Sequence, residues 1–158
     1  MSRATLEAAI PAGAAVLLDT STILAYLSGQ EAVSPAATIV LDEFVARGRN
    51  RAVISTITVT ESLVRPIRAA SESAERAVEA FLGHFPTLAV VPIDFAIARD
   101  AARIRARSAA PTPDALILAS GLRAGVGVVV ANDAAWQRII GRAGLEFTLC
   151  HLDAHGEP

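Results

Sequence analysis

Lysine is absent from this chain of 158 residues, and all 14 of its basic residues are arginine. A phosphate-binding P-loop requires a lysine after its glycines, and a protein kinase requires one on a strand. A response-regulator receiver domain, which also presents an acidic pocket, relies on a lysine as well. The absence of lysine therefore excludes these three Mg²⁺-dependent phosphate chemistries.

Cysteine occurs only once, at Cys150, so the chain can form no internal disulfide and no cysteine-rich zinc site. We therefore expect a reducing, cytoplasmic location. The apolar run over residues 8–18 contains Pro11 and Gly13 and leads into Asp19, which is unlike a signal peptide with its small-residue cleavage site. Because no run reaches the roughly 18–20 apolar residues of a membrane span, we expect no membrane association.

Aromatic residues are also scarce, at 4%, although hydrophobic residues make up 53% of the chain. This aliphatic composition favours a parallel sheet buried between helices, and the length suits a single domain. We expect that domain over residues 15–150, with an N-terminal extension over 1–14 and a flexible tail over 151–158. The net charge of −2 provides no overall attraction to nucleic acid.

Short apolar runs alternate with helical patterns along the whole chain. This alternation predicts a three-layer α/β/α protein whose central layer is a mainly parallel sheet of four to five strands. Pro66 is expected to break or kink its helix. The expected strands cover residues 15–18, 51–55, 88–91, 126–130 and 147–150, and the expected helices cover 20–27, 35–47, 58–68, 73–85, 95–108, 113–124 and 133–140.

Four acidic residues lie where an apolar strand-like run gives way to a helical pattern. Parallel strands bring their carboxyl ends to one edge of the sheet, where α/β folds build their sites. Acids gathered there repel one another unless a cation lies between them, and hard oxygen ligands suit Mg²⁺ or Mn²⁺. The pattern predicts a metal-dependent phosphoryl-transfer site formed by Asp19 in AAVLLDTSTILAYL, Glu61 in AVISTITVTESLV, Asp114 in APTPDALILAS and Asp133 in VGVVVANDAAW.

Helix capping is the alternative interpretation of these acids. An aspartate at a helix start accepts backbone N–H bonds, which stabilises the helix by about 0.5–2 kcal/mol. Asp19, Asp114 and Asp133 each precede or begin an expected helix. Glu61 lies inside its helix, so capping explains three of the acids separately but does not explain the set.

The ordered set of segments resembles the PIN-domain ribonucleases, specifically the VapC-like toxins of bacterial toxin–antitoxin pairs. The segments LLDTSTILAYL, ISTITVTESL, RIRARSAAPTPDALILASGL and VGVVVANDAAW carry this resemblance from about Val16 to Phe147. It implies a metal-dependent endoribonuclease whose catalytic and metal-binding residues are Asp19, Glu61, Asp114 and Asp133, with Mg²⁺ or Mn²⁺ activating a water at the scissile phosphate. It also implies an RNA substrate, a homodimer and a cognate antitoxin whose segment enters the acidic groove.

The chain departs from the family pattern two residues before the last acid. That position is often Thr or Ser in the family, but here it is Ala131, followed by Asn132 as a candidate replacement. Thr20 and Ser21, directly after Asp19, are candidates for hydrogen bonds to a metal-bound water or a phosphate; capping is the alternative for Thr20.

A row of arginines provides candidate RNA contacts. Arg99, Arg103 and Arg107 are spaced by four residues and fall on one helix face, where they can follow an RNA backbone. The favoured alternative is a solvated face with salt bridges to Asp100 or to nearby glutamates. Trp136 can stack on a base, but packing onto the sheet is the favoured interpretation.

Two other functions stay open on the sequence. The first alternative to a toxin is a PIN-domain nuclease with a role in RNA processing or DNA cleavage. The second is a degenerate PIN domain that binds RNA or protein without cutting. Substitution of Asp19 or Asp114 by Asn separates these cases, because only a nuclease loses its function.

Overall fold

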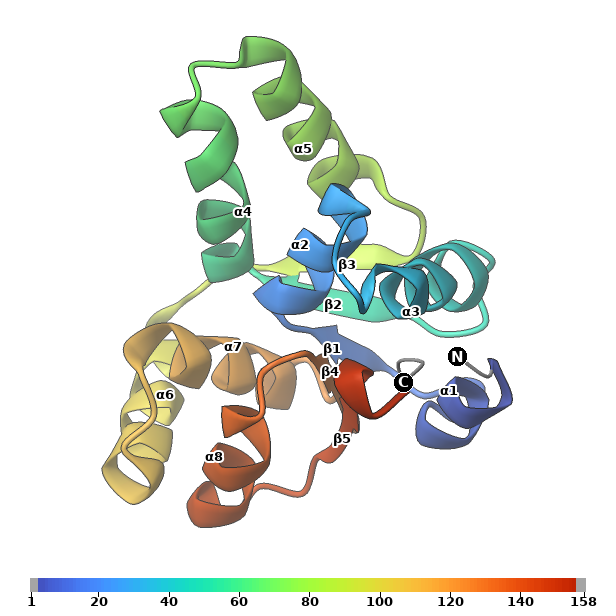
Figure 1. Ribbon diagram of the computed structural model, residues 1–158. Coiled ribbons are helices and arrows are strands. Elements are labelled where there is room, and N and C mark those ends of the chain that lie inside the picture. The colour runs from blue at the N-terminus through green and yellow to red at the C-terminus, as the bar shows by residue number, and fades with distance from the viewer. Residues whose placement is uncertain (1–2, 156–158) are drawn as a thin grey trace.

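A computed structural model describes residues 3–155 of the chain. Its centre is a five-stranded sheet in the order β3-β2-β1-β4-β5, and every neighbouring pair of strands is parallel. The middle strand pairs on both sides, with Val16 opposite both Ala52 and Val128. The predicted α/β fold with a parallel sheet is confirmed (Figure 1). The strands are β1 (Val16–Leu18), β2 (Ala52–Ser55), β3 (Leu88–Val91), β4 (Val128–Ala131) and β5 (Thr148–His151).

Helices connect the strands, and local sequence signals set several of their ends. The Asp94 carboxylate accepts a hydrogen bond from the Ile97 backbone N–H at 2.8 Å and caps α6, whereas Gly29, with φ of 63°, ends α2. None of the described helices is long and apolar enough to cross a membrane. The helices are α1 (Arg3–Ala9), α2 (Thr20–Ser28), α3 (Ser34–Thr38), the π-helix η1 (Ile39–Val45), α4 (Thr56–Arg68), α5 (Glu72–His84), α6 (Phe95–Ser108), α7 (Thr112–Arg123), α8 (Ala135–Ala143) and the 3₁₀ helix η2 (Leu152–His155).

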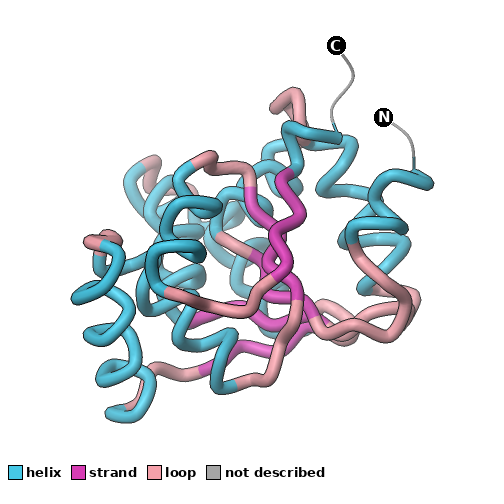
Figure 2. Tube along the Cα trace, turned by 90° about the horizontal axis from the view of Figure 1, so that it is seen from below, coloured by secondary structure: helices cyan, strands magenta, loops and turns pink. Residues whose placement is uncertain are grey.

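Helices cover both faces of the sheet, as Figures 1 and 2 show. Along each strand, alternate side chains enter different cores. Val16 and Leu18 pack with residues of α1, α2, α3 and η1, whereas Leu17 packs with residues of α6, α7 and α8. Burial on both faces explains why the central strands contain almost only apolar residues.

The segment around α4 differs from the sequence expectation. A break or kink at Pro66 was expected; the helix does not break there and continues to Arg68. Pro66 falls in the last turn, where its missing N–H removes one backbone bond close to the helix end and leaves the rest of the helix intact. Helices α4 and α5 lie side by side and project from the sheet (Figure 1).

The chain segments outside the expected domain pack against it where the structure describes them. Leu6 and Ile10 are fully buried in the core that also contains Val16. At the other end, Leu152 is fully buried and begins η2, so this part of the expected tail is packed. Residues 156–158 of that tail lie outside the described residues. The domain boundaries stay predictions.

Candidate active site

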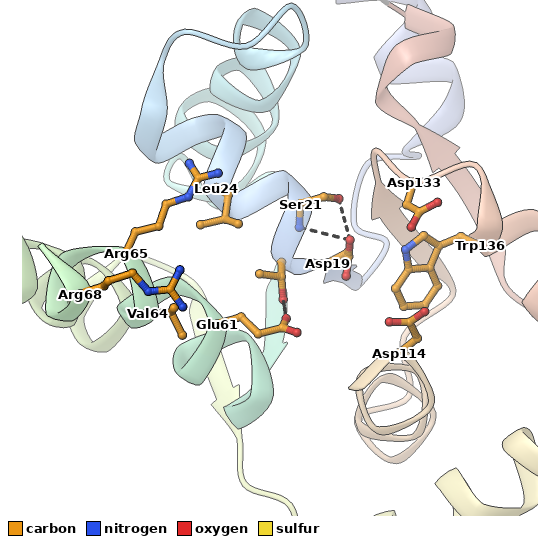
Figure 3. A pocket seen from close by; sticks show the side chains of 11 residues that line it. Asp19, Ser21, Leu24, Glu61, Val64, Arg65, Arg68, Asp114, Asp133 and Trp136 are labelled. Carbon is orange, nitrogen blue, oxygen red and sulfur yellow. Dashed lines mark hydrogen bonds between the residues drawn. The ribbon is translucent and has the colours of Figure 1, made fainter. Parts of the chain in front are cut away.

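The four acidic side chains come from four separate segments of the chain and line one pocket of about 490 Å³ (Figure 3). Asp19 follows β1, and Asp133 follows β4, the strand beside it in the sheet. Glu61 lies in the second turn of α4, and Asp114 lies in the first turn of α7. The pocket therefore lies at the carboxyl edge of the parallel sheet.

Asp19 is the most deeply buried of the four, with only 6% of its surface exposed. Its Oδ2 accepts hydrogen bonds from the Ser21 hydroxyl at 2.6 Å and from the Ser21 backbone N–H at 3.2 Å. Burial raises the pKa of Asp19, and the bonds from Ser21 oppose part of that rise. Asp19 thus caps α2 and also lines the pocket, so its capping role is confirmed and its role as a metal ligand stays a prediction.

Asp114 shows the mutual repulsion of the cluster. Its pKa is raised to about 6, first by burial and then by the negative charges of Asp19, Asp133 and Glu61. Because its carboxylate is only partly buried, water screens some of this repulsion. A cation in the pocket would remove the penalty for ionising Asp114.

Two hydroxyl-bearing residues hold the acids in place. The Thr20 hydroxyl donates to Glu61 Oε2 at 2.5 Å and lies 3.3 Å from the Thr58 hydroxyl. The Ser21 hydroxyl, which donates to Asp19, accepts the backbone N–H of Asn132 at 2.9 Å. Thr20 and Ser21 therefore orient carboxylates across segments that are distant in sequence.

The Asn132 side chain points to a different partner. In the amide orientation that matches the surrounding groups, its Nδ2 donates to both carboxylate oxygens of Asp153, at 3.0 and 3.3 Å. The Asn132 side chain thus ties the loop after β4 to η2, and its backbone N–H supports Ser21. Ala131, at the position where the family often has Thr or Ser, is fully buried in the core.

The donor chemistry of the pocket fits a hydrated divalent cation. Its candidate ligands are carboxylate and hydroxyl oxygens, the hard ligands that Mg²⁺ and Mn²⁺ prefer. Within residues 3–155, however, no three His, Cys, Asp or Glu side chains converge closely enough to hold one ion together. Mg²⁺ commonly keeps several waters and uses only one or two carboxylates with substrate phosphates, so the wider spacing suits it.

Two arginines that the sequence analysis missed also line the pocket. Arg65 and Arg68 follow Glu61 by four and seven residues, which places all three on one face of α4. Their spacing from Glu61 is the sequence signal that could have identified these two arginines. Leu24, Val64 and Trp136 complete the apolar part of the lining.

The arginine row proposed from the sequence lies elsewhere. Arg99, Arg103 and Arg107 do not line the pocket. Arg103 pairs with Asp100 at 2.9 Å, which supports the salt-bridge interpretation for this residue, and Arg107 donates to the Ala143 carbonyl at 3.5 Å. RNA contact by this row stays a prediction.

Trp136 packs against the sheet, as the favoured interpretation holds. Only 2% of its surface is exposed, and it belongs to the same core as Leu17 and Val129. Its ring borders the acidic pocket, but burial leaves it little surface on which a base could stack.

A parallel α/β/α domain with acids at the carboxyl edge of its sheet belongs to the class of α/β folds that build their sites at that edge. The PIN domain profile matches residues 16–141, and the chain therefore belongs to the PIN domain family. This confirms the family expected from the sequence. No protein with a curated description matches the chain in sequence.

Several solved structures share the fold at low sequence identity. VapBC2 from Rickettsia felis, bound to a DNA fragment from its promoter, has a TM-score of 0.64 and 15% identity over 87% of this chain and 98% of its own. VapC20 from Mycobacterium tuberculosis, a toxin that cleaves the sarcin–ricin loop, has a TM-score of 0.64 and 17% identity over 77% of this chain and 92% of its own. FitAcB from Neisseria gonorrhoeae has a TM-score of 0.64 and 19% identity over 87% of this chain and 97% of its own.

Proposed function

We propose that this protein is a metal-dependent endoribonuclease and the toxin of a toxin–antitoxin pair. The observation that carries the proposal is that four acids from four separate segments line one pocket of a PIN domain. The similarity in fold to VapC20, which cleaves an RNA loop, and to VapBC complexes supports the same function. The reaction is hydrolysis of RNA phosphodiester bonds.

The chain's own residues have distinct roles in this proposal. Asp19 and Asp114 hold Mg²⁺ or Mn²⁺, because burial and repulsion raise the pKa of both and a cation relieves that penalty. Glu61, oriented by Thr20, acts through a water, and the exposed Asp133 serves a second ion. When bound, the metal supplies positive charge at the scissile phosphate and lowers the pKa of water.

The partners follow from the same pocket. A cognate antitoxin would place a segment across the apolar side chains of Leu24 and Val64 and direct an arginine at the acids, since a guanidinium binds carboxylates with two hydrogen bonds. VapBC complexes among the structures of similar fold support an antitoxin partner. We also propose that the toxin is a homodimer.

The first test is cleavage of total bacterial RNA by the purified protein with Mg²⁺, Mn²⁺ or EDTA, beside the Asp114→Asn variant. We expect discrete fragments that require metal and disappear in the variant, while circular dichroism shows an unchanged fold. Absence of cleavage with every metal would favour a degenerate binding domain. Growth arrest on expression in cells, absent for Asp114→Asn, would favour a toxin over an RNA-processing nuclease.

A further inference from the structure

We propose that Arg65 and Arg68 bind the RNA backbone at phosphates next to the bond that is cut, and so position the substrate in the acidic pocket. The inference rests on the proposed function and extends it to two positioning residues. Both arginines line the same pocket as the four acids. We call them the arginine pair.

The arginine pair extends the site along α4. Glu61, Arg65 and Arg68 share one helix face, and at 1.5 Å per residue the two arginines lie roughly 6 and roughly 10 Å beyond Glu61 along the helix axis. Figure 3 shows the pair on the α4 side of the pocket, with Asp114 and Asp133 on the opposite side. An RNA strand that crosses the pocket therefore passes from the acids to the arginine pair.

The guanidinium groups of the pair have no partner within the described part of the protein. Neither forms an ion pair or a side-chain hydrogen bond there, although four carboxylates line the same pocket. Several other arginines do have acidic partners, namely Arg3, Arg76, Arg103 and Arg123. Both side chains of the pair are exposed, so their planar donors are available to bind phosphate with two hydrogen bonds.

The charge pattern of the pocket favours a nucleic-acid backbone as the ligand. An RNA strand presents an anionic phosphate at each nucleotide, so one phosphate can meet the metal at the acids while its neighbours meet the arginines. A protein partner would need basic groups for the acids and acidic groups for the arginines in the matching order. The simplest alternative is structural: both arginines lie in the last turn of α4, where a positive charge contributes about 0.3–1 kcal/mol against the helix dipole.

The test measures how RNA binding depends on salt. In an Asp114→Asn background, which we expect not to cleave, a single-stranded RNA oligonucleotide is titrated with Mg²⁺ present at several NaCl concentrations. Loss of two phosphate contacts in Arg65→Gln/Arg68→Gln should weaken binding and lower the slope of log affinity against log salt by about 1.4, since each contact to single-stranded nucleic acid contributes about 0.7.

A matched control removes the same charge from another part of the molecule. Arg47 precedes β2 and Arg142 lies in the last turn of α8, which places both toward the amino edge of the sheet, opposite the pocket. Arg47→Gln/Arg142→Gln should leave the slope unchanged. Equal loss in the two double variants would mean that net charge alone matters, and no loss in either would mean that the arginines do not contact phosphate; both results overturn the proposal.

Two further measurements separate the remaining explanations. Arg65→Lys/Arg68→Lys keeps the charges and should restore most of the slope of log affinity against log salt. Thermal unfolding of all variants reports any structural role of the pair. In the cleaving protein, Arg65→Gln/Arg68→Gln should raise KM for a longer RNA but not for a dinucleotide, which has no neighbouring phosphate. If the unaltered protein cleaves RNA but the pair has no effect, only this inference fails; if it neither binds nor cleaves RNA, the proposed function fails with it.

Discussion

At the scale of single residues, the acids of the pocket also perform ordinary structural work. Asp19 caps α2 by accepting the Ser21 backbone N–H, and Asp133, two residues before α8, accepts the Ala135 backbone N–H at 2.8 Å. A cap fixes a carboxylate at the point where a strand ends, which is also where the fold builds its site. A capping contact and a place in the pocket therefore do not exclude each other at these residues.

Asp114 should make the metal-free protein less stable as pH rises. Its folded-state pKa of about 6 exceeds its ordinary value of 3.8, so the folded state holds the proton more tightly and loses stability as pH rises between these values. With EDTA present, Asp114→Asn should unfold at a higher temperature than the unaltered protein at pH 7.5. The difference should largely disappear near pH 4. The exposed Glu79→Gln serves as the control, and equal melting temperatures for Asp114→Asn and the unaltered protein at both pH values would contradict the prediction.

Ser21 should matter for activity because it holds Asp19. Ser21→Ala removes the 2.6 Å bond to Asp19 and the acceptor for the Asn132 N–H. Loss of such a supporting contact lowers metal affinity or activity by about 10–100-fold. Titration calorimetry with Mn²⁺ and the rate of RNA cleavage measure the effect. Ser28→Ala, at the far end of the same helix, removes hydroxyl bonds of 3.3–3.5 Å to the Ala25 carbonyl, Glu31 and the Gln30 N–H, none of which lines the acidic pocket, and should behave like the unaltered protein.

At the scale of elements, boundaries marked by local chemistry were predictable and others were not. The strand Leu88–Val91 has the expected bounds because Pro92 ends it. β4 begins two residues later than expected, because the Val126 N–H donates to the Gly121 carbonyl and closes the end of α7. The expected helix over 35–47 is divided into α3 and η1, where the Ala46 N–H bonds to the Leu41 carbonyl five residues back. An apolar pattern does not distinguish these hydrogen-bond registers.

At Gly121, α7 packs closely against β1. A Cβ at this position would lie 2.8 Å from Leu17 Cδ2 and 3.1 Å from Val126 Cγ2, so either the buried Leu17 side chain or α7 itself would have to shift. Gly121→Ala should therefore lower the free energy of unfolding by about 1–3 kcal/mol in urea denaturation. Gly141→Ala is the matched change in α8, where a Cβ meets nothing within 4 Å; helix propensity should make it neutral or up to about 1 kcal/mol stabilising. Similar effects at both positions would disprove the close-packing argument.

At the scale of the whole molecule, the sequence predicted which acids line one pocket but not which contacts hold them in place. The carboxyl edge of a parallel sheet follows from alternating strands and helices, and that edge gathers the acids. The bond from Thr20 to Glu61 joins residues 41 apart, and that from Asn132 to Ser21 joins residues 111 apart. Such contacts depend on how helices pack on the sheet, which an apolar pattern does not specify.

Metal binding should connect the pocket to the stability of the entire domain. An ion that binds only the folded state stabilises it by about 2.7 kcal/mol when its concentration is 100 times Kd. Because the acids come from four separate segments of the chain, Mg²⁺ or Mn²⁺ should raise the Tm of the unaltered protein in a concentration-dependent way. Asp19→Asn/Asp114→Asn should be more stable without metal and gain nothing from it. NaCl at matched ionic strength controls for screening of the repulsion, and an equal rise with NaCl would show that the pocket responds to charge in general and holds no specific ion.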